Sequence, residues 1–136
     1  TDLNARLGIE QLKKIDKISK IRHVNFTRYK NQLPNFWSQK SGLDLISSFG
    51  YATFVKNRLE VYKFLKSKKI QTRPLICGNM GQQPFLKKRS FSNKDLVNSK
   101  YVDKYGIYLP NHANLKFNDI DYVSRVFKKI AEPFNF

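Results

Sequence analysis

The sequence predicts a small α+β domain, an α/β two-layer arrangement in which helices cover one face of a three-stranded sheet. Two observations indicate this class. Segments with apolar residues at helical spacing alternate with short segments rich in β-branched and aromatic residues, in the order helix, strand, helix, strand, helix, strand, helix. The length of 136 residues also fits a single domain that buries a core of its own.

The first predicted element is a long helix over residues 2–33, continuous or as two helices in line. Thr1 is a residue type that caps helices, and Asp2 is favourable in the first turn because it lies at the positive end of the helix dipole. The apolar residues recur mostly three or four positions apart: Leu3, Leu7, Leu12, Ile15, Ile18, Ile21, Val24 and Phe26. We expect Gly8 to mark a bend or a close packing contact, and Pro34 to end the helix.

The middle of the chain predicts a strand, a helix and a second strand. Residues 43–55 are rich in aromatic and β-branched side chains, which is typical of a strand. Asn57 is expected to cap a helix that continues to Leu65. The apolar positions of this helix give it a face to bury: Leu59, Val61, Tyr62, Phe64 and Leu65. Residues 70–73 form the short second strand.

The last third of the chain predicts a helix over residues 92–104, a third strand over residues 105–109 and a turn over residues 110–115. A final helix over residues 117–131 ends before Pro133. Its apolar residues have helical spacing: Ile120, Val123, Phe127 and Ile130. Aromatic residues at strand or helix spacing are assigned to the core: Phe49, Tyr51, Phe54, Tyr62 and Phe64.

The charge balance is strongly basic, because 26 Lys and Arg against 10 Asp and Glu give a net charge of +16. Such an excess suits nucleic acid, an anionic membrane surface or an anionic ligand. The basic residues are dispersed along the chain instead of gathered in one stripe, which favours a solvated surface that helps to attract an anionic substrate. A basic nucleic-acid-binding module is the alternative from another functional class.

Composition also limits the compartment and the chemistry. No run approaches the roughly 20 apolar residues that a membrane-spanning helix needs, so no membrane partner is expected. The one cysteine, Cys77, excludes an internal disulfide and a metal site built on paired cysteines, and it is interpreted as a buried apolar residue. Together with the absence of a signal peptide, this favours the cytoplasm.

Residues 70–84 have the composition of a binding loop. Its two prolines restrict the backbone, and its two glycines allow conformations that other residues rarely adopt. The apolar residues of the segment show neither helical nor strand periodicity. Four side chains supply directional donors suited to phosphate, ribose or sugar hydroxyl groups: Arg73, Asn79, Gln82 and Gln83. Two alternatives stay open, namely a surface salt bridge for Arg73 and a loop whose polar side chains satisfy its own backbone.

Asn111 and His112 follow the third predicted strand at its junction with a turn, where a substrate contact is expected. A general-base role for His112 is conceivable, but a structural hydrogen bond is the commoner role of such a histidine. His23, amid Lys20 and Arg22, is interpreted as a surface residue. The sequence thus predicts six substrate-binding residues and no catalytic, cofactor-binding or metal-binding ones: Arg73, Asn79, Gln82, Gln83, Asn111 and His112.

Three segments resemble, in order, the C-terminal part of the DegT/StrS family of PLP-dependent nucleotide-sugar aminotransferases, and the resemblance extends to about Ile130. The segments are Thr1-Asp2-Leu3-Asn4-Ala5-Arg6-Leu7-Gly8, then Thr72-Arg73-Pro74 with Gly78-Asn79 and Gln83-Pro84, and finally Tyr108-Leu109-Pro110-Asn111-His112. The middle segment is most similar to the branch of 4-keto-6-deoxy-sugar 3-dehydratases of lipopolysaccharide biosynthesis. The fold that the resemblance implies is the C-terminal domain of fold-type I PLP enzymes.

The resemblance also implies a function. This domain would close the active site on a nucleotide-linked 4-keto-6-deoxy sugar, with C3 dehydration as the reaction and transamination at the ketone as the alternative. Arg73 would face the active-site cleft. Pyridoxal or pyridoxamine phosphate would be held by a separate cofactor domain upstream of Thr1, in an enzyme that is a homodimer. This chain alone is then expected to bind no cofactor and to catalyse nothing.

The chain does not begin with Met and starts inside a motif, so we expect one C-terminal small domain, residues 1–136, without its cofactor domain. Residues 1–33 would link it to that domain, and residues 43–131 would form the sheet-and-helix body. The apolar side chains at the start of the linking helix would then be exposed, or hidden by self-association: Leu3, Leu7 and Leu12.

Overall fold

A computed structural model of the chain describes residues 1–42, 44–76, 78–86 and 96–134. Within these residues, five α-helices accompany one three-stranded antiparallel sheet, which confirms the predicted α+β class. The elements are α1 (Asp2–Leu12), α2 (Ile15–Gln32), β1 (Gly50–Phe54), α3 (Arg58–Ser67), β2 (Arg73–Pro74), the short 3-10 turns η1 (Met80–Gln82) and η2 (Pro84–Leu86), α4 (Val97–Tyr105), β3 (Gly106–Pro110) and α5 (Phe117–Lys128).

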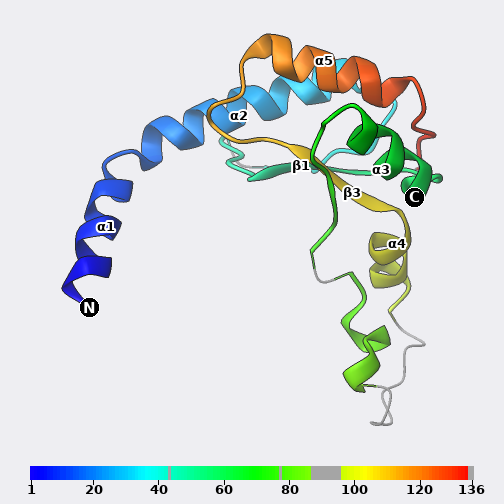
Figure 1. Cartoon of the computed structure of the whole chain (residues 1–136), viewed down its shortest axis with the longest axis horizontal. Coiled ribbons are helices and arrows are strands. Elements are labelled where there is room, and N and C mark those ends of the chain that lie inside the picture. Colours follow the sequence, from blue (N-terminus) through cyan, green and yellow to red (C-terminus); the bar gives the residue numbers. More distant parts are fainter. Residues whose placement is uncertain (43, 77, 87–95, 135–136) are drawn as a thin grey trace.

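The helices α2 and α5 lie side by side over one face of the sheet, and α3 lies next to α5 (Figure 1). The core between the layers is largely aromatic. Tyr29 of α2 stacks on Tyr51 of β1 at a ring distance of 5.0 Å, and Phe127 of α5 meets Phe36 at 5.0 Å. The predicted period of the last helix is confirmed, since the side chains that face the sheet are buried: Ile120, Val123 and Phe127.

The predicted N-terminal helix forms as two helices with a break at Lys13 and Lys14. The break does not occur at Gly8, where an added Cβ would meet no atom within 4 Å, so the expectation of a bend or a close contact there was wrong. Nor does the Thr1 side chain cap α1. Figure 1 shows α1 extending away from the body, and no residue of α1 is buried.

The apolar face of α1 is therefore exposed, as predicted. The exposed fractions are 69% for Leu3, 57% for Leu7 and 65% for Leu12. A helix with this much bare apolar surface gains little from packing within the described chain. Within the same residues, no helix is both long and apolar enough to cross a lipid bilayer.

The sheet has the order β1-β3-β2, and all pairs are antiparallel. β1 pairs with β3 along its whole length, from Gly50 opposite Pro110 to Phe54 opposite Gly106. β2 contributes only two pairs, because Pro74 has no N–H to donate and is a residue that ends sheet pairing. β2 begins at Arg73, opposite Tyr108, so residues on β3 beyond Tyr108 have a strand neighbour on the β1 side alone.

The prediction of a strand over residues 43–55 was wrong in its first half. Only Gly50–Phe54 is a strand, and Leu43 itself lies outside the described residues. The backbone before Gly50 bonds to side chains instead: the Ile46 N–H donates to His23 Nδ1 at 3.1 Å, and the Ser48 carbonyl accepts from Asn111 at 2.8 Å. His23 is consequently half-buried, which corrects its interpretation as a surface residue.

Smaller corrections concern the ends of the other helices and strands. α3 begins after Asn57, but this side chain does not cap it. Asn57 instead donates to the Ile130 carbonyl at 2.8 Å and accepts the Glu132 N–H at 3.1 Å, so it fastens the segment after α5. α5 ends at Lys128, earlier than predicted. The predicted start of the helix over residues 92–104 lies outside the described residues, and that helix ends at Tyr105.

Strand positions shift slightly, and three side chains assigned to buried faces are exposed. The second strand is Arg73–Pro74 instead of residues 70–73, and the third is Gly106–Pro110 instead of residues 105–109. The exposed side chains are Leu59, Phe49 and Tyr62. In α3 the buried positions are Val61 and Leu65, one turn apart, and Phe64 is partly buried against the same core.

Residues 75, 76 and 78–86 and α4 extend away from the sheet (Figure 1), and we call them the arm. Its base is held by Arg58, whose guanidinium donates to the carbonyls of Asp103 and Gly106, the latter at 3.3 Å. At Gly106 an added Cβ would lie 2.5 Å from Leu75 Cδ1 and 2.5 Å from the Val102 carbonyl oxygen. The chain can therefore make this junction between α4 and β3 only with glycine.

Candidate functional site

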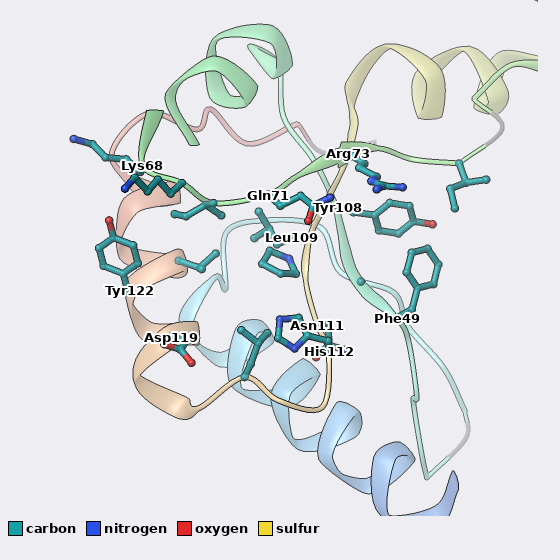
Figure 2. A pocket seen from close by; sticks show the side chains of 17 residues that line it. Phe49, Lys68, Gln71, Arg73, Tyr108, Leu109, Asn111, His112, Asp119 and Tyr122 are labelled. Atoms are coloured by element: carbon teal, nitrogen blue, oxygen red, sulfur yellow. The ribbon is translucent and has the colours of Figure 1, made fainter. Parts of the chain in front are cut away.

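An open groove of about 530 Å³ lies along the C-terminal end of β3, beyond the point where β2 begins to pair with it (Figure 2). One wall comes from Phe49 and Tyr108, whose rings are 5.0 Å apart. The opposite wall comes from the segment after α3 and from the N-terminal half of α5, including Tyr122. The volume falls within the range of small-molecule sites, and the mixed aromatic and charged lining suits a polar ligand with an apolar part.

Arg73 lies in this groove because of strand pairing. Residues directly opposite each other in an antiparallel pair project to the same face, and Arg73 is opposite Tyr108. This is the sheet face away from the helical layer, since the neighbouring strand residues Ile107 and Leu109 are buried in the core. Arg73 is exposed, and in the described part of the chain no carboxylate pairs with it. The salt-bridge alternative thus has no partner there, and the guanidinium is available for an anion.

His112 also lines the groove, and its side chain is exposed. Its backbone carbonyl accepts from the Leu115 N–H at 3.2 Å and from Asn25 Nδ2 at 3.4 Å, so the turn that carries it is fixed. Figure 2 shows the imidazole next to Asn111 at the end of β3. The ring is therefore held on an ordered turn and remains open to a ligand, which agrees with the predicted substrate contact without testing it.

Asn111 has a different position. Its side chain is 1% exposed, and Nδ2 donates to the carbonyls of Arg22 at 3.2 Å and Ser48 at 2.8 Å. Both amide hydrogens thus join α2 to the segment that leads into β1. Its Oδ1 is buried without a hydrogen-bond partner among the described residues. The geometry favours a structural role for Asn111, and its contact with substrate stays a prediction.

The three remaining candidates lie on the arm, and none of them lines the groove. Asn79 is buried, and its Oδ1 accepts the Gly81 N–H at 3.1 Å, which caps η1. This bond is what a loop that satisfies its own backbone would show. Gln82 is exposed and Gln83 half-buried, so both stay available for contacts outside the described chain. Cys77 lies outside the described residues, and its interpretation stays a prediction.

Gly78 explains why the arm turns where it does. Its φ of +44° lies in the left-handed region, and an added Cβ would lie 2.1 Å from Asp103 Oδ1 of α4. The loop backbone therefore passes directly against α4 and is directed away from the groove. The predicted site accordingly divides into a groove set and an arm set.

Sequence reasoning missed several residues that line the groove: Phe49, Lys68, Lys69, Gln71, Asp119 and Tyr122. No local motif marks them, because they meet only through the packing of α3, α5 and the sheet. Asp119 is the one carboxylate among the described residues that line the groove, and its Oδ2 accepts the Lys116 N–H at 2.8 Å to cap α5. Within the described residues, no three His, Cys, Asp or Glu side chains gather where they could hold a metal ion.

A charged pair fixes the helical layer behind the groove. Arg28 of α2 donates to Asp121 of α5 through two bonds of 2.6 Å, and Gln32 also donates to this carboxylate. The hydrogen bond from Arg28 holds the pKa of Asp121 below its usual range. Burial raises the pKa of Tyr51 to about 12, since ionisation would place a charge in the core.

Comparison with known proteins places these features in context. A model of the DegT/DnrJ/EryC1/StrS aminotransferase family matches residues 1–128. The chain is 28% identical, over 138 residues, to GDP-4-keto-6-deoxy-D-mannose 3-dehydratase of Escherichia coli O55:H7, covering 93% of this chain and 35% of that protein. It is 28% identical, over 144 residues, to the lipopolysaccharide biosynthesis protein RfbH of Salmonella typhimurium, covering 95% of this chain and 32% of that protein.

Among solved structures, the E. coli GDP-4-keto-6-deoxy-D-mannose-3-dehydratase with bound hydrated PLP superposes with a TM-score of 0.75 at 28% identity. The match covers 88% of this chain and 33% of that one. The chain thus spans about a third of the length of the relatives that it matches.

Proposed function

The chain belongs to the DegT/DnrJ/EryC1/StrS aminotransferase family, and from this premise we propose that it serves as the substrate-closing small domain of a PLP- or PMP-dependent enzyme. The substrate is a nucleotide-linked 4-keto-6-deoxy sugar, and the reaction is C3 dehydration in the biosynthesis of lipopolysaccharide sugars. The names of the relatives at 28% identity support this choice of substrate and reaction.

The observation on which the proposal rests most is the unpaired Arg73 in the groove. A guanidinium binds a diphosphate through two parallel hydrogen bonds, and its position on a strand before a proline limits its freedom. Tyr108 and Phe49 next to it give an apolar wall for a sugar or base ring. His112 at the other end of β3 can bond to a hydroxyl group of the same ligand.

The groove residues do not fit the cofactor. A pyridoxal phosphate site needs an acidic partner for the pyridine nitrogen and a phosphate cradle. Asp119, the carboxylate in the groove, is occupied by the cap of α5. The proposal therefore assigns the cofactor to a separate domain of the enzyme, and the exposed apolar face of α1 is the surface that would pack against that domain. The cytoplasm is the compartment that this biosynthetic role suggests.

Titration of the chain with guanosine diphosphate by calorimetry tests the groove. We expect measurable binding that the Arg73→Gln variant weakens about tenfold, the value of one charge-assisted hydrogen bond. Arg73→Lys should recover part of the affinity, because lysine keeps the charge without the bidentate geometry. Arg6→Gln on α1 removes the same charge away from the groove and should bind like the parent chain. An equal loss in both glutamine variants would refute the assignment of Arg73.

The reaction type has a separate test in the gene upstream of Thr1. A dehydratase of this family is expected to have a histidine where an aminotransferase has its cofactor-linking lysine. A lysine at that position would replace dehydration with transamination and leave the role of the groove unchanged.

A further inference from the structure

A second concave surface lies between the C-terminal end of α3 and the outer side of α5. We call it the α3–α5 hollow, and its volume is about 410 Å³. Its lining residues are Phe64, Lys68, Tyr122, Arg125, Val126 and Lys129. We propose that the hollow is an anion site for the diphosphate group of a small molecule, separate from Arg73.

In the described part of the chain, no carboxylate forms a salt bridge with the cations of the hollow, although, after the hydrogen bond from Arg28, the charge of Arg125 also helps to lower the pKa of Asp121. Among the described residues, the salt bridges join Lys13 to Glu10 and Arg28 to Asp121. Asp121, which lies one turn before Arg125, is thus already held by Arg28. Three positive charges therefore surround one hollow with no carboxylate bonded to them, an arrangement that attracts a multivalent anion.

Aromatic rings lie beneath two of these cations. Lys68 Nζ is 5.6 Å from the centre of the Phe64 ring, and Arg125 Cζ is 5.8 Å from the centre of the Tyr122 ring. Such contacts order a long side chain without neutralising its charge. The positive charges of Lys68 and Arg125 stay available for an anion. Because the two side chains are already ordered, they lose less conformational entropy on binding than free side chains would.

The backbone at Lys69 provides an independent observation. Lys69 follows the last turn of α3 with a φ of 59°, a left-handed conformation that favours glycine. The bonds from Ile70 N–H to the Leu65 carbonyl at 2.9 Å and from Lys69 N–H to the Lys66 carbonyl at 3.0 Å identify a Schellman motif. This motif fixes the course of the chain at Lys68, which lines the hollow.

The position of Lys69 connects the two surfaces. Lys69 lines the groove, and its neighbour Lys68 lines both the groove and the hollow. Figure 2 shows Lys68 and Tyr122 at the side of the groove opposite Arg73 and Phe49. Tyr122 belongs to the helical layer and Arg73 projects from the other face of the sheet, so the two side chains lie on opposite walls of the groove. A second anion can therefore bind without displacing one held by Arg73.

The size of the hollow favours a small ligand over nucleic acid. Proteins that hold single strands offer a track of several stacking rings, whereas here Tyr122, 40% exposed, is the exposed ring of the hollow. A diphosphate carries enough charge for three or four cations at one place. The inference does not depend on the proposed function, because inorganic pyrophosphate is a sufficient probe.

Calorimetric titration of the whole chain with pyrophosphate tests the proposal. Arg125→Gln and Lys129→Gln should each weaken binding about threefold, the value of an exposed ion pair. Lys63→Gln removes a charge from α3 outside the hollow and should leave pyrophosphate binding unchanged. Arg73→Gln removes a charge from the groove and should abolish only the pyrophosphate held there, so that a second bound pyrophosphate, sensitive to Arg125→Gln, remains. A loss with Lys63→Gln as large as that with Arg125→Gln, or a loss confined to Arg73→Gln, would overturn the inference.

Lys69→Gly separates binding from folding. Glycine relieves the left-handed strain, so the variant should melt at a higher temperature, while its affinity for pyrophosphate in the hollow, which Lys69 does not line, stays unchanged. A loss of pyrophosphate binding in Lys69→Gly as large as that in Arg125→Gln would place the anion in the groove and overturn the inference. Guanosine diphosphate in place of pyrophosphate identifies the source: tighter binding indicates a nucleotide stacked on Tyr122, and equal binding indicates a free diphosphate. Tighter binding of a thymidine oligonucleotide with a steep salt dependence would replace the small-molecule site with a nucleic-acid surface.

Discussion

Replacement of Asn111 by alanine tests whether this residue supports the fold or contacts substrate. The variant removes two donated hydrogen bonds, to the carbonyls of Arg22 and Ser48. The Arg22 carbonyl lies inside α2, where the helix ladder also provides a donor, so its loss costs only about 0.5–1 kcal/mol. The Ser48 carbonyl is outside any helix or strand and half-buried, so leaving it without a donor costs about 1–2 kcal/mol.

The sum of about 2 kcal/mol corresponds to a fall of roughly 7 °C in the melting temperature of a chain of this length. Circular dichroism at helical wavelengths measures this change, and urea unfolding at fixed temperature gives the free energy independently. Asn114→Ala is the matched control, because Asn114 is an exposed asparagine on the same turn. A melting temperature for Asn111→Ala as close to the parent as that of Asn114→Ala would refute the structural role. A loss of nucleotide binding without a loss of stability would restore the role in substrate contact.

Three further outcomes follow from the packing and the charges. Gly106→Ala should destabilise the chain by about 1–3 kcal/mol in urea unfolding, since its Cβ would overlap the Val102 carbonyl, and unchanged stability would contradict the close junction. Asp121→Asn should lose its stability difference from the parent as pH falls through the depressed pKa of Asp121, because that carboxylate stabilises the fold only while ionised beside Arg28; a difference that persists in acid would refute this. Tyr51→Phe should resist unfolding between about pH 10 and pH 12 better than the parent, because the pKa of Tyr51, raised to about 12, makes ionisation favour the unfolded chain there. Parallel loss of stability with pH in both chains would contradict this last expectation.

Hydrophobic periodicity in the sequence was sufficient to predict the buried face of a helix. In α5 the apolar spacing identified the buried residues Ile120, Val123 and Phe127, because a helix on a sheet buries one stripe whatever its partner is. The segment before Gly50 has strand composition but is not a strand. Its backbone partners are the side chains of His23 and Asn111, 23 and 63 residues away, which no local pattern reveals.

The candidate site was predictable to the extent that one strand pairing explains it. Arg73 and His112 share the groove because β2 meets β3, and both were named from their positions at strand ends. The loop after β2 could not be oriented from composition. Its direction depends on the left-handed turn at Gly78 and on contact with α4, so Gln82 and Gln83 lie on the arm. Lys68 and Lys69 follow the end of α3, and no motif in the sequence indicates that they line the groove.

Pro74 also has a consequence for the behaviour of the chain in solution. An outermost strand with a full row of free amide and carbonyl groups acts as a template on which other polypeptides add, and this leads to aggregation. β2 ends after two residues at a proline, so it presents almost no such row. β2 itself thus offers few groups on which a strand from a neighbouring molecule could add at this border of the sheet.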